Sequence, residues 1–272
     1  FPALKASVDR DRRPGRFLLT GSANVLLLPK IGESLAGRIE ICTLWPLSEG
    51  ELAGVKETFI DRLFSASGWA PATVAPMDPP LPERLLRGGF PEVVLRPEAG
   101  RREAWFRAYI TTLLQRDVRD LANIEGLTAM PRLLMLLASR VGGLLNVADL
   151  GRSLGAPHST LTRYLTLLEM LFLLHRVPAW SVNLGKRLVK APKTYLCDVG
   201  LVAHLNGVTL ERLGQDPGTV GPLLENLVAM ELLKQPGWSQ NRVSLYHYRS
   251  TAGQEVDFLM EGSGDRVAAV EV

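Results

Sequence analysis

Three carboxylates in the last quarter of the sequence have a spacing that suits metal-dependent chemistry. Glu225 lies in residues 220–234, which have the pattern of an amphipathic helix. Three strands are expected after this helix, at 242–248, 255–260 and 266–272. Asp257 falls in the second strand and Glu271 near the end of the third, so adjacent strands can bring both to one sheet edge beside Glu225. Such oxygen ligands suit Mg²⁺, which can activate water against a phosphodiester. The alternative is ordinary strand-end charges.

Residues 146–174 have the pattern of a helix-turn-helix. Residues 147–154 are expected to form the first helix, and Gly155 falls where a left-handed turn residue is needed. Ser159 or Thr160 can cap the second helix, whose apolar positions recur at helical spacing. The exposed start and outer face of this helix then carry His158, Ser159, Thr160, Thr162 and Arg163. This face enters the major groove in DNA-binding proteins of this type, and the alternative is a helical hairpin in an all-α region.

A basic hairpin is expected directly after these helices. Residues 176–180 and 193–197 have the pattern of two strands, and a further helix is expected before the helix-turn-helix, at 130–141. The hairpin carries Lys186, Arg187, Lys190 and Lys193. Three helices followed by such a hairpin are the layout of a winged helix, in which the wing contacts phosphates. We therefore expect double-stranded DNA as a partner. A winged helix used only for protein contacts is the alternative.

The composition restricts the class of protein without defining it. The 272 residues include 46% hydrophobic and 22% charged residues, and a formal charge of +3 is too small to indicate nucleic acid by itself. Cys42 and Cys197 have no metal-ligand spacing and favour a reducing, cytoplasmic location. No apolar run is long enough to span a bilayer, so no membrane association is expected.

The N-terminal region contains a short apolar segment, Arg16–Thr20, that is expected to be a buried strand. It ends in Thr-Gly-Ser, which would place hydroxyl groups at the carboxyl edge of a parallel sheet, where ligands bind. This pattern resembles the strand tip of an AAA+-type ATPase at which a polar residue senses the γ-phosphate. Residues 34–38 (SLAGR) and 44–48 (LWPLS) strengthen the match, which is to a prokaryotic family of ATP-binding proteins with a C-terminal domain of unknown function.

The resemblance extends through the rest of the chain. Its further landmarks are Gly88–Glu92, Gln115–Asp120, the helix-turn-helix, Lys190–Lys193, Asp198–Leu201, Glu225, Glu255–Phe258 and Val270–Val272. It implies ATP and Mg²⁺ as cofactors of the intact protein and a homo-oligomer formed through the ATPase part. No G-x-x-x-x-G-K-[ST] motif occurs, so the phosphate-binding loop is expected before Phe1 and the chain is interpreted as a fragment.

The same resemblance assigns residues to two sites. Thr20, Ser22 and Arg38 would form the far wall of a nucleotide site, with Arg38 acting on the γ-phosphate in cis or from a neighbouring subunit. A surface pairing of Arg38 with a carboxylate is the alternative. The order of helix Glu, strand Asp and Glu-x-Lys resembles a PD-(D/E)xK nuclease, which implies catalytic Glu225, Asp257 and Glu271 and metal binding by the last two. The lysine would lie beyond Val272, so this fragment is expected to be weak or inactive.

These observations together predict a multidomain chain of the α/β and α+β classes. Residues 1–48 would be the last part of a P-loop AAA+-type core and 49–130 a helical lid or linker. Residues 131–201 would form the winged helix and 202–272 a truncated PD-(D/E)xK-like α/β domain. Three functions follow: an ATP-driven DNA-associated machine, a Mg²⁺-dependent DNA nuclease, and a non-catalytic interaction protein.

Overall fold

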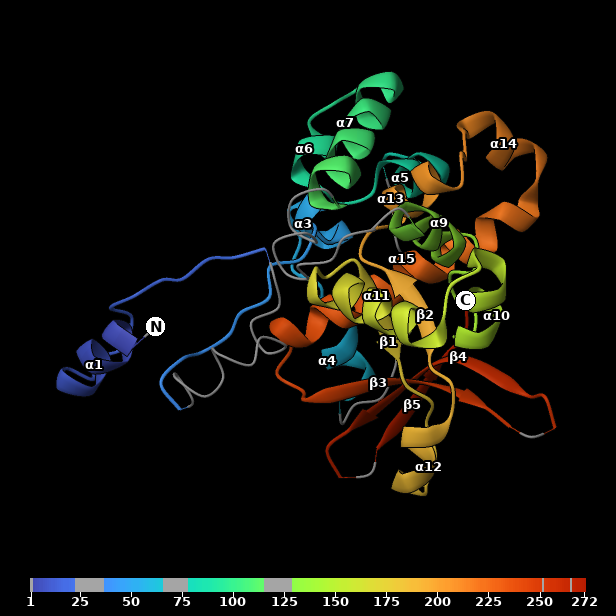
Figure 1. Ribbon diagram of the computed structural model, residues 1–272. Helices are drawn as coiled ribbons and strands as arrows, with labels where there is room; N and C mark the ends of the chain where they lie inside the picture. The colour runs from blue at the N-terminus through green and yellow to red at the C-terminus, as the bar shows by residue number, and fades with distance from the viewer. Residues whose placement is uncertain (1, 23–36, 66–77, 115–128, 251, 265) are drawn as a thin grey trace.

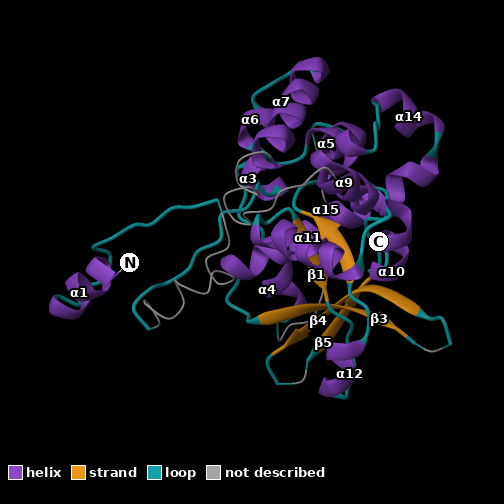
Figure 2. Ribbon diagram, in the orientation of Figure 1, coloured by secondary structure: helices purple, strands orange, loops and turns teal. Residues whose placement is uncertain are grey.

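Helices and two small antiparallel sheets make up the described part of the computed structural model (Figures 1 and 2), which covers residues 2–22, 37–65, 78–114, 129–250, 252–264 and 266–272. The helices are α1 (Pro2–Arg10), α3 (Glu49–Ala53), α4 (Phe59–Leu63), α5 (Leu81–Arg87), α6 (Pro91–Val94), α7 (Ala99–Thr112), α9 (Met130–Ala138), α10 (Val147–Leu154), α11 (His158–Met170), α12 (Leu184–Val189), α13 (Val199–Leu205), α14 (Leu210–Gln215) and α15 (Val220–Lys234). The strands are β1 (Leu174–Val177), β2 (Lys193–Leu196), β3 (Val243–Arg249), β4 (Glu255–Gly262) and β5 (Val267–Val270). The mixed α/β class that the sequence predicts is therefore observed.

The two sheets are joined by backbone contacts. β1 and β2 pair antiparallel, with Leu174 opposite Leu196, and the connection between them contains α12. β3, β4 and β5 form an antiparallel meander in which Phe258 lies opposite Val270. Just after β1, Trp180 N donates to His247 O of β3 at 2.7 Å, and a parallel bridge joins Ala179 to the same residue. The hairpin is therefore anchored to the larger sheet.

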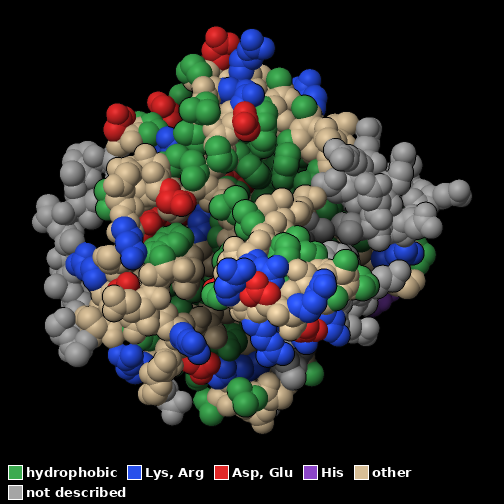
Figure 3. All heavy atoms as spheres, turned by 90° about the vertical axis from the view of Figure 1, so that its left-hand side faces the viewer, with side chains coloured by type: hydrophobic (Ala, Val, Ile, Leu, Met, Phe, Trp, Pro, Cys, Tyr) green, Lys and Arg blue, Asp and Glu red, His purple; other side chains and the backbone are tan. Residues whose placement is uncertain are grey.

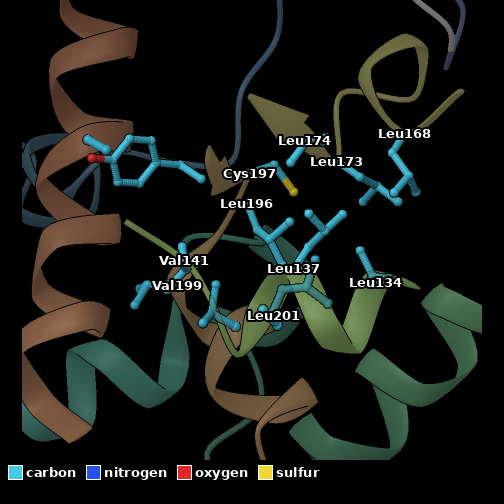
Figure 4. Close-up of a cluster of buried hydrophobic side chains, with 14 of the residues drawn as sticks. Leu134, Leu137, Val141, Leu168, Leu173, Leu174, Leu196, Cys197, Val199 and Leu201 are labelled. Atoms are coloured by element: carbon cyan, nitrogen blue, oxygen red, sulfur yellow. The ribbon is translucent and has the colours of Figure 1, made fainter. Parts of the chain in front are cut away.

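One apolar core runs through most of the chain. Its buried side chains extend in sequence from Ile60 to Met260. In its centre, Leu134 and Leu137 of α9 gather with Leu196 of β2 and Leu201 of α13 (Figure 4). Contacts also link regions that the sequence predicts as separate domains: Asn206 Nδ2 donates to Ala138 O at 2.9 Å, for example. Residues 45–272, as far as the structure describes them, therefore pack as one body.

The N-terminal segment differs from this body and from its prediction. α1 stands apart from the other helices (Figure 1), and none of its side chains is buried. Residues 16–20, expected as a buried strand, have no strand structure, and Leu18 is 89% exposed. A strand needs a neighbour to satisfy its backbone groups and cover its apolar side chains, and no described segment pairs with this one. The prediction of a buried strand is therefore wrong for this structure.

The helix-turn-helix elements agree closely with expectation. α10 has the predicted bounds, Asn146 Oδ1 accepts a hydrogen bond from Asp149 N, and Gly155 has a φ of 64° in the left-handed region. The inward positions predicted on α11 are all buried: Leu161, Tyr164, Leu165 and Leu168. The predicted cap is wrong, because α11 begins earlier, after Pro157, and has no side-chain cap. Among the described residues, no helix is long and apolar enough to cross a membrane.

Candidate functional site

Three carboxylates converge on one buried ammonium group. Lys193 Nζ lies 3.0 Å from Glu225 Oε1, 2.8 Å from Glu255 Oε1 and 2.9 Å from Asp257 Oδ1. The Lys193 side chain is 3% exposed, whereas that of Glu255 is 35% exposed. Two of the predicted catalytic residues, Glu225 and Asp257, are therefore brought together, as the sequence indicated. We call these four residues the Lys193 cluster.

The elements around the cluster fix each side chain. Lys193 is the first residue of β2, and Glu225 lies on α15. Glu255 and Asp257 are two positions apart on β4, so both point to the same face. Gly142, with a φ of 78°, lets the backbone approach closely, because a Cβ there would lie 2.7 Å from Glu225 Oε2. The cluster is thus built where α15, β2 and β4 meet.

Glu271 lies beside the cluster rather than in it. Asp257 N donates to Glu271 Oε2 at 3.3 Å, and Val272 N donates to Asp257 Oδ2 at 3.2 Å. The β4–β5 register places the two acidic residues opposite each other, because Phe258 pairs with Val270. Asp257 and Glu271 therefore meet at one sheet edge, and their catalytic and metal-binding roles stay predictions.

Hydrogen bonding keeps the Lys193 ammonium charged. Burial opposes the charge on Lys193, but its hydrogen bonds to Glu255, Asp257 and Glu225 raise its pKa above the usual value. Tyr195 donates its hydroxyl hydrogen to Glu225 Oε1 at 2.7 Å. Burial, followed by the charge of Glu225, raises the pKa of Tyr195, so this phenol stays a neutral donor. The carboxylates are thus satisfied by protein donors.

The arrangement does not fit the expected Mg²⁺ site. Magnesium needs several oxygen ligands that face one open position. Here the oxygens of Glu225 and Asp257 face the Lys193 ammonium, and within the described residues no group of three or more acidic, histidine or cysteine side chains is placed to hold a metal ion. We therefore derive no metal-dependent step from these residues.

The basic hairpin has fewer available cations than its sequence suggests. Lys193 is buried in its cluster. Arg187 forms two hydrogen bonds with Glu261, at 2.6 and 2.8 Å, and its guanidinium lies over the rings of Trp180 and Tyr246. Both side chains are held by acidic partners within the fold in this conformation, and their DNA contacts stay predictions. Lys190 remains exposed, with Nζ 3.3 Å from Arg249 O, and the Lys186 side chain lies outside the described part.

The outer face of α11 is polar, as predicted. Arg163 is exposed and Thr160 is half-buried. The hydroxyls of Thr162 and Thr166 donate to the carbonyl oxygens of His158 and Thr162, one turn earlier. On the molecular face seen in Figure 3, Lys and Arg side chains are interspersed with Asp and Glu, so positive charge there is not uniform. Any nucleic-acid surface on this face is therefore local.

The predicted nucleotide-binding residues lie in the N-terminal segment. Thr20 and Ser22 are exposed and outside regular secondary structure. Arg38 Nε lies 2.6 Å from Asp9 Oδ1, in a partly exposed ion pair. The surface pairing that the sequence left open for Arg38 is thus present, and the nucleotide-binding role of these three residues stays a prediction.

The sequence does not predict two members of the Lys193 cluster as parts of this site, nor two residues next to it. The sequence points to Glu255 only through the family resemblance, although two acidic residues two positions apart on a strand share a face. The sequence predicts Lys193 on an exposed wing, because a lysine is rarely buried without partners and the partners of Lys193 are distant in sequence. No motif in the sequence indicates that Tyr195 or Gly142 lies next to this site.

Three family models match successive parts of the chain. Residues 1–53 match an AAA domain, residues 79–212 match a domain of unknown function, DUF8612, and residues 220–272 match another, DUF4143. These matches support an AAA-like, ATPase-related family whose remaining domains are uncharacterised. Lys193 falls in the second match and its three carboxylates in the third.

Relatives of the chain occur in bacteria and archaea. An uncharacterized protein of Mycobacterium tuberculosis is 34% identical over 97% of this chain and 54% of its own length. Uncharacterized proteins of Haemophilus influenzae and Methanocaldococcus jannaschii are 26% and 24% identical, over 99% and 93% of this chain and 60% and 54% of their own lengths. The chain thus spans 54–60% of the length of these relatives. No solved structure matches at a significant level.

Proposed function

We propose that this chain is the DNA-binding part of an AAA-like, ATPase-related protein. The observation that carries the proposal is the geometry of α10 and α11. They are joined through the left-handed Gly155, bury their apolar faces and leave the outer face of α11 polar. With α9 before them and the β1–β2 hairpin after them, they have the order of a winged helix.

The proposed DNA contacts follow from which side chains are accessible. Thr160 and Arg163 lie on the first half of α11, the part of a recognition helix that approaches base edges. Lys190, exposed at the end of the hairpin connection, would contact phosphate. Arg187 and Lys193 are omitted because each is held by acidic partners within the fold.

The nucleotide part of the proposal rests on the AAA domain match over residues 1–53. In the intact protein, Thr20, Ser22 and Arg38 would line one side of an ATP and Mg²⁺ site, and subunits would associate through this part. ATP hydrolysis would then change the position of the DNA-binding elements. The hydrogen bonds from the β1–β2 hairpin to α15 offer a rigid connection that would transmit such a movement.

Binding to duplex DNA, measured by fluorescence anisotropy across a salt series, tests the proposal. We expect salt-dependent binding, and we expect the Arg163→Ala/Lys190→Ala variant to bind about tenfold more weakly with a shallower salt dependence. Arg101→Ala/Arg107→Ala is the matched control, since it also removes two charges and both arginines are exposed on α7, away from α11 (Figure 1). Absence of binding at low salt, or equal losses in both variants, would overturn the proposal and favour a protein-interaction role.

A further inference from the structure

We infer that Lys193 is the resident cation of its cluster and locks the β1–β2 hairpin onto the α15–β4 surface, in the place that a divalent metal ion would need. The cluster is then a structural lock between the DUF8612 and DUF4143 regions. This inference does not depend on DNA binding by the chain.

The donor count of the lysine supports this role. An ammonium group has three N–H donors and no acceptor. Lys193 Nζ has three carboxylate oxygens within 3.0 Å, one each from Glu225, Glu255 and Asp257. Its side chain is 3% exposed, so every donor is directed to protein and none to solvent. A metal ion at the same point would have to displace the ammonium.

Neighbouring contacts show that the cluster joins two parts of the chain. Tyr195, two residues along β2, donates to the same Glu225 oxygen as Lys193. The next residue, Leu196, exchanges both of its backbone hydrogen bonds with the buried Asn226 side chain on α15, at 2.9 and 3.1 Å. The hairpin is therefore attached to α15 by an ion pair, a hydroxyl hydrogen bond and two amide hydrogen bonds, all made by residues of β2.

The charge balance explains why the lysine is needed. Three carboxylates and one ammonium leave two negative charges, which Arg249 offsets in part at 3.8 Å from Glu255. Removal of the ammonium would leave three carboxylates facing one point without a cation. Uncompensated buried charges are strongly destabilising. These carboxylates would attract a divalent cation and would bind it if their oxygens moved closer together than they lie around the ammonium.

Two measurements on the full chain test the inference: thermal unfolding with and without millimolar divalent cation, and Mn²⁺ binding followed by the loss of the free-ion electron paramagnetic resonance signal. We expect the wild-type chain to bind no Mn²⁺ and to keep its Tm when Mg²⁺ or Ca²⁺ is added. We expect Lys193→Met, of similar length without the charge, to lose at least about 5 °C in Tm, to regain part of it with divalent cation, and to bind Mn²⁺.

Control variants separate the lock from a general charge effect. Lys190→Met removes an exposed lysine of the same hairpin and should change neither Tm nor Mn²⁺ binding. If Lys193→Met does not fold, Lys193→Met/Glu255→Gln restores the net charge of the cluster and should fold. Mn²⁺ binding by the wild-type chain would overturn the inference and assign the carboxylates to a metal centre. An unchanged Tm in Lys193→Met would show that Lys193 does not hold the β1–β2 hairpin on the α15–β4 surface.

Discussion

At the residue scale, His175 couples the stability of the fold to pH. Its Nε2 lies 2.9 Å from Phe172 O, and its ring lies 4.9 Å from that of Trp45. Burial lowers the pKa of His175 to about 4, although the Phe172 carbonyl opposes the shift. The imidazole is therefore neutral at the pH values at which an unfolded histidine, with a pKa near 6.5, begins to take up a proton.

The sign of the effect follows from this difference in pKa. The unfolded chain binds the proton first, so the stability due to a neutral His175 is complete above about pH 6.5 and is lost as the pH falls towards 4. We expect a loss of about 2 kcal/mol over this interval, reduced from the full shift because the ring is partly exposed. Urea unfolding at several pH values should show a smaller loss for His175→Gln than for the wild type.

The comparison of wild type and variant isolates this residue. Burial also lowers the pKa of His204 and His247, so part of the dependence should persist in His175→Gln. Equal pH dependence in the two proteins would show that His175 is protonated as readily in the folded as in the unfolded chain.

The charged residues show what a sequence reveals of a site and what it does not. Asp257 and Glu271 could be placed together because strand order and the alternation of side chains are local properties. The positions of Lys193 and Arg187 could not be predicted, since their acidic partners are 32 to 74 residues away. A lysine in a basic-looking segment has the same local pattern whether it is solvated or buried among carboxylates.

At the element scale, β2 depends on α15 for its place in the fold. Asn226 is fully buried; its side-chain oxygen accepts from Leu196 N, and its amide nitrogen donates to Leu196 O. We expect Asn226→Ala to lower the free energy of unfolding by about 3 kcal/mol, because two buried backbone groups lose their partners. Asn206→Ala, which removes one partly buried bond to Ala138 O, should cost about 1 kcal/mol.

Urea unfolding followed by tryptophan fluorescence and by circular dichroism measures both variants. Coincident transitions are expected, because the two uncharacterised regions share one core. Similar small losses in both variants would contradict a central role for the Asn226 contacts.

The same scale shows why the helices were easier to predict than their surroundings. α10 and α11 are determined by local signals, namely a capping Asn, a turn glycine and apolar residues at helical spacing. α12 has no comparable pattern. Its position is fixed instead by Arg187, which binds Glu261 on β4. The connection between the two strands of the predicted hairpin therefore contains a helix that is held against the other sheet.

At the scale of the whole molecule, the described part of residues 1–53 contributes to the fold in two different ways. Up to residue 44 no described side chain is buried, and Leu44 itself is 99% exposed. From Trp45 onward the chain is anchored. Leu47 N donates to Gly89 O at 2.8 Å, Leu47 O accepts from Lys234 Nζ, and Glu49 pairs with Arg84.

This difference predicts the result of two truncations. A chain that begins at Leu44 should keep its Tm within about 2 °C, because none of the described residues that it lacks is buried. A chain that begins at Gly54 should lose at least about 5 °C, since it leaves the buried Lys234 without one acceptor and uncovers His175, which contacts Trp45. Scanning calorimetry of both proteins measures this. A large loss of Tm in the chain that begins at Leu44 would show that residues 1–43 stabilise the rest of the fold. The AAA-like N-terminal region would then not be a separate unit attached to it.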